Sequence, residues 1–323
     1  MSLAVRAGMI RTFALNPAVD VSLVVSELVP VRKLRATSTR REVGGGGVNV
    51  ARLLVRMGSE VECVVAAGGA TGAEVVAALV GAEIVVTELP AGGMTRESIQ
   101  IHDVASDLRY RVVVDGPPLT NTPKEIISLL AEAQAPDVNV FSGSLPSGCP
   151  PAIYADLSEV HARAFTIVDT SGAALAASVT GSIDLLKPCL SELESLVGQE
   201  IHDAAMLERV TIDLLEKNGS VGSVLTSLGA AGAVLGQRDR PMIHFRPPDV
   251  RVVSAVGAGD SMVAGVAWSI SRGKTIVDAC RFGVAAGTAT VATPGSALCT
   301  RADAEALVDA VEVSELGPEL AIT

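Results

Sequence analysis

The sequence predicts an α/β fold of three layers, in which helices cover both faces of a mostly parallel sheet and a small β-sheet lid is attached. The first observation behind this prediction is that short β-branched runs alternate with helical patterns along most of the chain. Such alternation is typical of parallel strands joined by crossover helices. The runs that predict strands are residues 10–15, 61–66, 138–141, 165–168, 183–186 and 221–226.

The helical patterns between these runs have the spacing of one buried helix face. Val50, Leu53, Leu54 and Met57 stand at i, i+3, i+4 and i+7, and Gly58 follows as a stop signal. The same spacing recurs in two further sets, which are Ile126, Leu129, Leu130 and Ala133, and Val263, Val266, Ala267 and Ile270. These segments are therefore predicted to be amphipathic helices.

The second observation is that residues 21–42 and 95–115 look extended and partly alternating, with no helix between their strands. We interpret them as two excursions that form a small antiparallel sheet, which covers a site or pairs with another subunit. The α/β core then consists of residues 9–20, 43–94 and 116–313, and the tail after Val313 is predicted to fray. The alternative is that both segments extend an edge of the main sheet.

Composition limits the kinds of partner that the chain can have. The 323 residues include 25 Lys and Arg and 36 Asp and Glu, so the net charge is −11. This balance argues against nucleic acid and anionic membranes as partners. The apolar stretch 61–86 contains Glu62, Glu74 and Glu83, which argues against a membrane span. Five scattered cysteines without a C-x-x-C pair favour a reducing cytoplasm.

The segment 256–262 carries the most specific chemical pattern. Gly257, Ala258 and Gly259 precede a predicted helix, where backbone N–H groups and the helix dipole favour an anion. Asp260 falls in the first turn, where a carboxylate can accept a proton from an attacking hydroxyl while the amides hold the transferred group. The alternative is that Asp260 only caps the helix.

Other loops of small residues also follow predicted strands. They are Gly44 to Asn49, Asn16 to Asp20, Ser142 to Pro146, and Ser227 to Gly232. The glycine run does not fit a dinucleotide fingerprint, because Asn49 stands where the last glycine belongs. Together these loops predict a ligand cleft along the edge where the parallel strands end.

With these motifs in hand, the chain resembles the PfkB (ribokinase-like) family of sugar kinases from about residue 10 to about residue 309. Gly46 stands where 1-phosphofructokinases and tagatose-6-phosphate kinases usually have a lysine. The chain therefore resembles more closely the branch of the family that phosphorylates fructose 6-phosphate.

The resemblance implies ATP-dependent transfer of a phosphoryl group to the 1-hydroxyl of fructose 6-phosphate. Asp260 would be the base, and the amides of Gly257, Ala258 and Gly259 the anion hole. The residues implied in binding the sugar phosphate are Asp20, Lys33, Gly45, Gly46, Asn49, Arg96 and Ser144. Those implied for the nucleotide are Lys187, Glu192, Ser227, Gly229 and Gly232. Glu192 through water, and Asp169, would hold Mg²⁺; Lys33 would reach across a homodimer formed through the lid.

The sequence departs from the family pattern at two places that affect the binding of metal ions. Cys189 replaces the asparagine of the family's Asn-x-x-Glu run, which places the handling of Mg²⁺ in question. Residues 254–256 read Ser-Ala-Val instead of Asp-Thr-Thr, so binding of K⁺ stays open. The rival functions are tagatose-6-phosphate kinase or 1-phosphofructokinase, a kinase of nucleosides or unphosphorylated sugars, and a catalytically impaired sugar-phosphate sensor.

Overall fold

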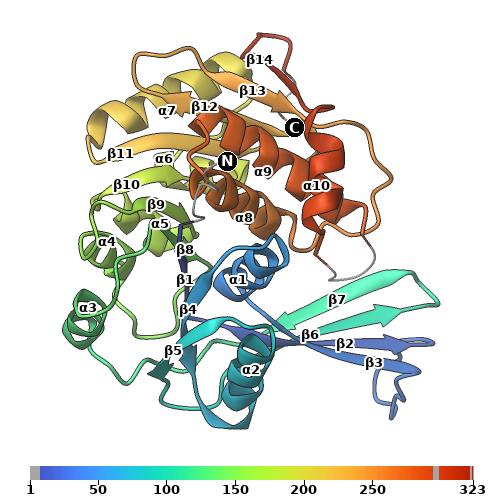
Figure 1. The fold of residues 1–323 in the computed structure, drawn as a ribbon. Coiled ribbons are helices and arrows are strands. Elements are labelled where there is room, and N and C mark those ends of the chain that lie inside the picture. The colour runs from blue at the N-terminus through green and yellow to red at the C-terminus, as the bar shows by residue number, and fades with distance from the viewer. Residues whose placement is uncertain (1–7, 294–297, 321, 323) are drawn as a thin grey trace, which may run out of the picture.

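The computed structural model describes residues 8–293, 298–320 and 322, and it contains one large and one small sheet (Figure 1). Seven strands of the large sheet are parallel: β1 Ile10–Ala14, β4 Val61–Ala67, β5 Val85–Pro90, β8 Val138–Ser142, β9 Phe165–Asp169, β10 Ile183–Leu186 and β11 Val221–Ser227. Three antiparallel strands extend one side: β12 Ala233–Gln237, β13 Ile243–Arg246 and β14 Glu312–Glu315. The order is β14-β13-β12-β11-β10-β9-β8-β1-β4-β5.

Helices cover both faces of this sheet, and each face has its own apolar core. One face is covered by α1 Gly46–Arg56, α2 Gly69–Gly81, α8 Ala258–Ile270, α9 Ile276–Val291 and α10 Arg301–Val308. The other face is covered by α3 Pro123–Ala131, α4 Ile153–Ser158, α5 Gly172–Ser178, α6 Leu190–Val197 and α7 Ala204–Lys217. Strand β1 serves both cores, since Ile10 and Ala14 face one and Phe13 the other. The predicted three-layer α/β fold is confirmed.

The prediction that the tail frays after Val313 was wrong. Strand β14 pairs with β13, with Val313 opposite Phe245, and the N–H of Leu316 donates to the carbonyl of Met242. All four residues of β14 are exposed, so no apolar alternation marks the strand in the sequence. Backbone pairing, together with an ion pair of 4.0 Å between Arg246 and Glu312, holds this segment.

The small sheet is the lid, and it projects away from the core (Figure 1). Its order is β3-β2-β6-β7, with bounds β2 Ala18–Val25, β3 Ser38–Gly44, β6 Arg96–Asp103 and β7 Leu108–Val113. The sheet is not wholly antiparallel as predicted, because the central strands β2 and β6 are parallel. Both leave the core at the same edge and run outward, so Ala18 lies opposite Arg96 at the base of the lid.

None of the helices in the described part of the chain combines the length and apolar character that crossing a membrane requires.

Candidate active site

Asp260 lies where the amino-terminal ends of α1 and α8 meet. Its Oδ2 accepts a hydrogen bond of 2.7 Å from Nδ2 of Asn49, which belongs to the first turn of α1. Gly257 is the N-cap of α8, with φ of 79°, so the left-handed turn requires a glycine there. Asp260 is therefore not the cap of its helix, and its carboxylate faces a residue of another element.

The surroundings of Asp260 raise its pKa to about 6. Burial is the main cause, and the negative charge of Asp169 adds to it. The Asn49 hydrogen bond and the positive charge of Lys187 act in the opposite direction. A carboxylate with a pKa near neutrality is suited to accept a proton and release it again.

A buried ion pair lies beside Asp260. Asp169 ends β9, Lys187 follows β10, and Nζ of Lys187 lies 3.0 Å from Oδ1 of Asp169. A Cβ added to Gly259 would come within 3.8 Å of Nζ, which places the ammonium group beneath the amide loop. Burial alone would lower the pKa of Lys187, but the charges of Asp169, Glu192 and Asp260 outweigh it and the pKa is raised. Lys187 therefore stays charged next to the loop.

The base of the lid meets the loops that follow β1 and β8. Nε and Nη2 of Arg96 both donate to the carbonyl of Asn16, at 3.3 and 3.2 Å. The side-chain amide of Asn16 in turn donates to Oγ of Ser144 at 3.0 Å and to the carbonyl of Leu145 at 3.3 Å. Asn16 thus holds Arg96 and Ser144 on the two sides of a small cavity, which Gly45 and Gly46 also line.

Most of the glycine run is needed because the protein packs against itself there. A Cβ on Gly44 would lie 2.1 Å from Oδ2 of Asp20, and one on Gly46 would lie 2.4 Å from Oγ of Ser142. At Gly47 the carbonyl of Phe13 would be equally close, at 2.1 Å. These contacts hold Asp20, the cavity and α1 together, so close approach of a ligand is not the main reason for the glycines.

A wider cleft of about 730 Å³ lies between the start of α6 and the end of β11. Its lining includes Cys189, Ser191, Ser227 and Gly229. The carboxylate of Glu192 accepts the N–H of Cys189 at 2.8 Å and so caps α6. This cleft is large enough for a nucleotide.

Gly232 is not among the residues that line this cleft, although the family resemblance implied a role with the nucleotide. Its φ is 89°, and a Cβ there would lie 2.0 Å from the carbonyl of Phe245. Gly232 therefore shapes the turn between β11 and β12.

Lys33 is exposed in the connection between β2 and β3, which joins the ends of these strands that are far from Asp20 and Arg96. Within one chain it is not brought to the site. Sequence reasoning missed the linking role of Asn16, although the residue stands in the motif it singled out. It also missed Arg111, whose side chain lies on the lid near Asp20.

Within residues 8–293, 298–320 and 322, no three His, Cys, Asp or Glu side chains gather closely enough to hold a metal ion by themselves. The carboxylates of Asp169 and Glu192, whose negative charges act on Lys187, are oxygen donors of the kind Mg²⁺ prefers. Mg²⁺ usually takes one or two carboxylates together with substrate phosphates. This donor set fits such an ion.

The fold and the site together define the class of protein. A mostly parallel sheet with a β-sheet lid, and an aspartate behind a glycine turn at a helix start, is the arrangement of the ribokinase-like kinases. The chain matches the pfkB family of carbohydrate kinases over residues 14–303 and belongs to that family. The resemblance inferred from the sequence is confirmed, and a kinase of this family uses ATP and a divalent metal.

Individual relatives agree with this assignment. The chain is 35% identical to the ATP-dependent 6-phosphofructokinase isozyme 2 of Mycobacterium tuberculosis, over 96% of this chain and 92% of the relative. It is 32% identical to the 1-phosphofructokinase of Rhodobacter capsulatus, over 85% and 88%. Phosphofructokinase-2 of Escherichia coli in complex with potassium superposes with a TM-score of 0.87 at 32% identity, covering 94% of this chain and 99% of that one. The same enzyme with fructose 6-phosphate gives a TM-score of 0.84 at 31% identity and the same coverage.

Proposed function

We propose that this protein is an ATP-dependent 6-phosphofructokinase, which transfers the γ-phosphoryl group of ATP to the 1-hydroxyl of fructose 6-phosphate. The observation that carries the proposal is the position of Asp260. Its carboxylate is oriented by Asn49, lies behind the glycine turn at the start of α8, and is influenced by the charges of Asp169 and Lys187. Relatives named for this activity match almost the whole chain.

In this proposal Asp260 is the general base. With a pKa of about 6 it is mainly ionised at neutral pH, and it accepts the proton of the sugar hydroxyl as that oxygen attacks. The N–H groups of Gly257, Ala258 and Gly259 hold the transferred phosphoryl group at the start of α8. Lys187, fixed by Asp169, adds a positive charge beneath the same loop.

The nucleotide occupies the cleft beside Ser227 and Gly229. Asp169 and Glu192, the latter through water, would hold Mg²⁺, and the ion would supply positive charge to the phosphates. Phosphoryl transfer depends mainly on positioning and on stabilisation of charge, and these residues supply both. A bound K⁺ near residues 254–256 is part of the proposal, because the Escherichia coli relative was solved with potassium.

The sugar phosphate occupies the cavity at the base of the lid. Asp20, Gly45, Gly46, Asn49 and Ser144 contact its hydroxyl groups, and Arg96 pairs with its phosphate. Lys33 reaches the same phosphate from the lid of a second subunit in a homodimer. In support, one face of the lid exposes apolar side chains, which are Leu108, Tyr110 and Val112. We place this enzyme in the cytoplasm.

The test is a coupled ADP-release assay with ATP and excess Mg²⁺ that compares fructose 6-phosphate, tagatose 6-phosphate and fructose 1-phosphate. We expect the highest kcat/KM with fructose 6-phosphate. A preference for another sugar phosphate would keep Asp260 as base and reject the choice of substrate that rests on Gly46. A chain that binds fructose 6-phosphate without turnover would be a sensor, and the proposal would fail.

A further inference from the structure

The chain beyond β14 turns and lies against the core. Strand β14 runs antiparallel to β13, and the N–H of Leu316 donates to the carbonyl of Met242 at 2.8 Å. A turn follows, in which the N–H of Leu320 donates to the carbonyl of Gly317 at 3.3 Å. Leu316, Leu320 and Ile322 pack on the apolar core of the face that α3 to α7 cover. We call residues 316–320 and 322 the C-terminal segment, and apolar packing as well as the strand before it holds the segment in place.

The C-terminal segment places one side chain in the cleft that we assign to the nucleotide. Ile322 lines this cleft of about 730 Å³ together with Leu190, Ile201 and Leu228. All the other lining residues come from 189–202 and 227–231, so Ile322 supplies a wall from a distant part of the chain. Its side chain is only partly buried, so it has apolar surface that a ligand can cover.

The charges around the cleft indicate which part of a nucleotide meets which residues. At the end of β11 the N–H of Ser227 donates to the carbonyl of Pro188 at 3.0 Å, directly after the buried cation of Lys187. Beyond the start of α6 the lining carries two carboxylates, those of Glu194 and Glu200. A triphosphate is attracted to the first region and repelled by the second. The base is therefore the part of the nucleotide that suits the apolar lining.

We infer that the C-terminal segment forms one wall of the nucleotide site and that Ile322 packs against the base of the bound nucleotide. This inference rests on the proposed function, since it concerns the ATP of that reaction. A branched aliphatic side chain that covers one face of a heterocyclic base removes apolar surface of both groups from water. Ile322 therefore contributes to the binding of ATP and touches none of the reacting atoms.

The test uses a chain that ends at Leu316, the substitution Ile322→Ser, and a matched control, Glu319→Gln. The shortened chain keeps β14 and the bond to Met242. We expect KM for ATP to rise about 5- to 50-fold in the shortened chain and about 3- to 10-fold in Ile322→Ser, because an apolar contact with the base is lost. The KM for the preferred sugar phosphate should change less than about twofold. Glu319 is exposed in the same segment and is not among the lining residues, so Glu319→Gln should behave as the wild type.

Fragments of the nucleotide separate contact with the base from support of the whole cleft. Adenosine and inorganic tripolyphosphate are used as competitive inhibitors against ATP. If Ile322 packs on the base, the inhibition constant of adenosine rises in Ile322→Ser by a factor similar to that of KM, while that of tripolyphosphate stays the same. A similar rise for both fragments would mean that the segment only supports the cleft. A lower KM for ATP in the shortened chain would mean that the segment obstructs it. Either result overturns the inference, and so does an unchanged KM for ATP in both variants.

The outcome can be separated from the fate of the proposed function. The three sugar phosphates are first compared with the wild type, and the variants are then measured with whichever it prefers, so a wrong sugar leaves the inference testable. If the wild type turns over none of them, the proposed function fails, and ADP with Mg²⁺ is titrated calorimetrically into the wild type and the variants. Weaker binding to the shortened chain and to Ile322→Ser supports the inference, and equal or absent binding in all of them overturns it.

Discussion

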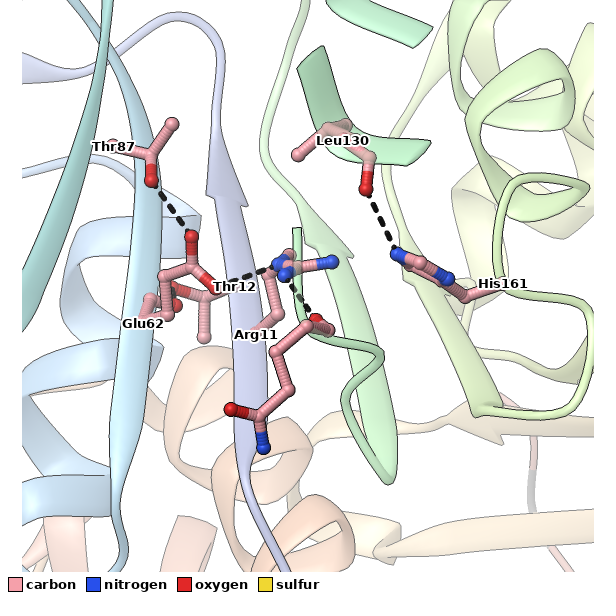
Figure 2. A network of polar contacts seen from close by, with 7 residues as sticks. Arg11, Thr12, Glu62, Thr87, Leu130 and His161 are labelled. Atoms are coloured by element: carbon pink, nitrogen blue, oxygen red, sulfur yellow. Dashed lines mark hydrogen bonds and ion pairs between the residues drawn. The ribbon is translucent and has the colours of Figure 1, made fainter. Parts of the chain in front are cut away.

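Two buried ion pairs lie in the large sheet. One is at the amino-terminal ends of the parallel strands, which we call the amino edge, and the other is at their carboxyl-terminal ends, the carboxyl edge. At the amino edge, Nε of Arg11 in β1 donates to Glu62 of β4 at 2.8 Å, and Thr87 of β5 donates to the same carboxylate at 2.7 Å (Figure 2). At the carboxyl edge, Lys187 lies 3.0 Å from Asp169. Both cations are nearly inaccessible, with exposed fractions of 1% and 5%.

The two pairs differ in what surrounds them. Arg11 also donates from Nη2 to the carbonyl of Gln134 at 2.7 Å, so its pair is one cation and one anion held by neutral partners. Lys187 instead faces Asp169, Glu192 and Asp260, one cation against three carboxylates. The amino edge is balanced by the protein alone. The carboxyl edge has surplus negative charge, which a bound metal ion would offset, and it is the edge at which we place the chemistry.

We expect the largest effect from removing the negative charge of Asp260 at the carboxyl edge. Asp260→Asn removes the proton acceptor and keeps the shape of the side chain, so we expect kcat to fall about 10²- to 10⁴-fold with little change in the affinity for sugar phosphate. Steady-state kinetics and calorimetric titration measure the two quantities. Near-normal turnover in this variant would show that another group is the base.

The matching change at the amino edge should act on stability and leave catalysis intact. Glu62→Gln removes the negative charge that pairs with a guanidinium group only 1% exposed, so we expect the free energy of unfolding to fall by about 3–5 kcal/mol. Urea denaturation measures it, and Glu60→Gln, at an exposed position nearby, is the control. A large loss of kcat in the folded variant would contradict the separation of the two edges.

The surplus charge at the carboxyl edge should itself cost stability. Because the pKa of Asp260 is raised from 3.8 to about 6, the native state binds more protons than the unfolded state between these values, and stability falls as the pH rises through this window. Asp260→Asn should therefore stabilise the protein by up to about 3 kcal/mol at pH 8 and by almost nothing below pH 4. Urea titrations at both pH values test this, with the exposed Asp249→Asn as control. A gain independent of pH would point to a cause other than charge.

The smallest effect is expected at Cys189, on the rim of the nucleotide cleft. Cys189→Asn supplies an amide oxygen beside Glu192, so the free Mg²⁺ needed for half-maximal activity should fall by up to about tenfold. The variant Cys189→Ser is the matched control, since it caps the helix without an amide. If both variants respond alike, capping of α6 explains the result, and if neither responds, the thiol is neutral.

Most of the core could be predicted because buried parallel strands appear in the sequence as continuous apolar runs. The six strands expected in the sequence all lie in the large sheet, each within a residue of its expected position. Strand β14 was missed since nothing in Glu-Val-Ser-Glu is buried, and the parallel pairing of β2 with β6 depends on where the core releases both strands.

The candidate active site was less predictable from the sequence than the core. The motif around Asp260 is local, so the family pattern identifies it, but its bond to Asn49 joins residues that only the fold brings together. Arg111 has no such motif, because an arginine on an exposed alternating strand looks the same whether it faces a ligand or the solvent. The packing of Gly44 and Gly46 against Asp20 and Ser142 was also hidden, since a sequence does not say what lies opposite a glycine.

The parallel pairing of β2 with β6 has a consequence for the order of folding. These strands are separated along the chain by β3, α1, β4, α2 and β5, so the lid cannot close until much of the core has formed. The face of the lid at which we place the sugar phosphate is then expected to be the last part of the protein to be completed. A refolding chain should therefore gain its nucleotide cleft before its sugar site, and fructose 6-phosphate should recognise only molecules that have finished folding.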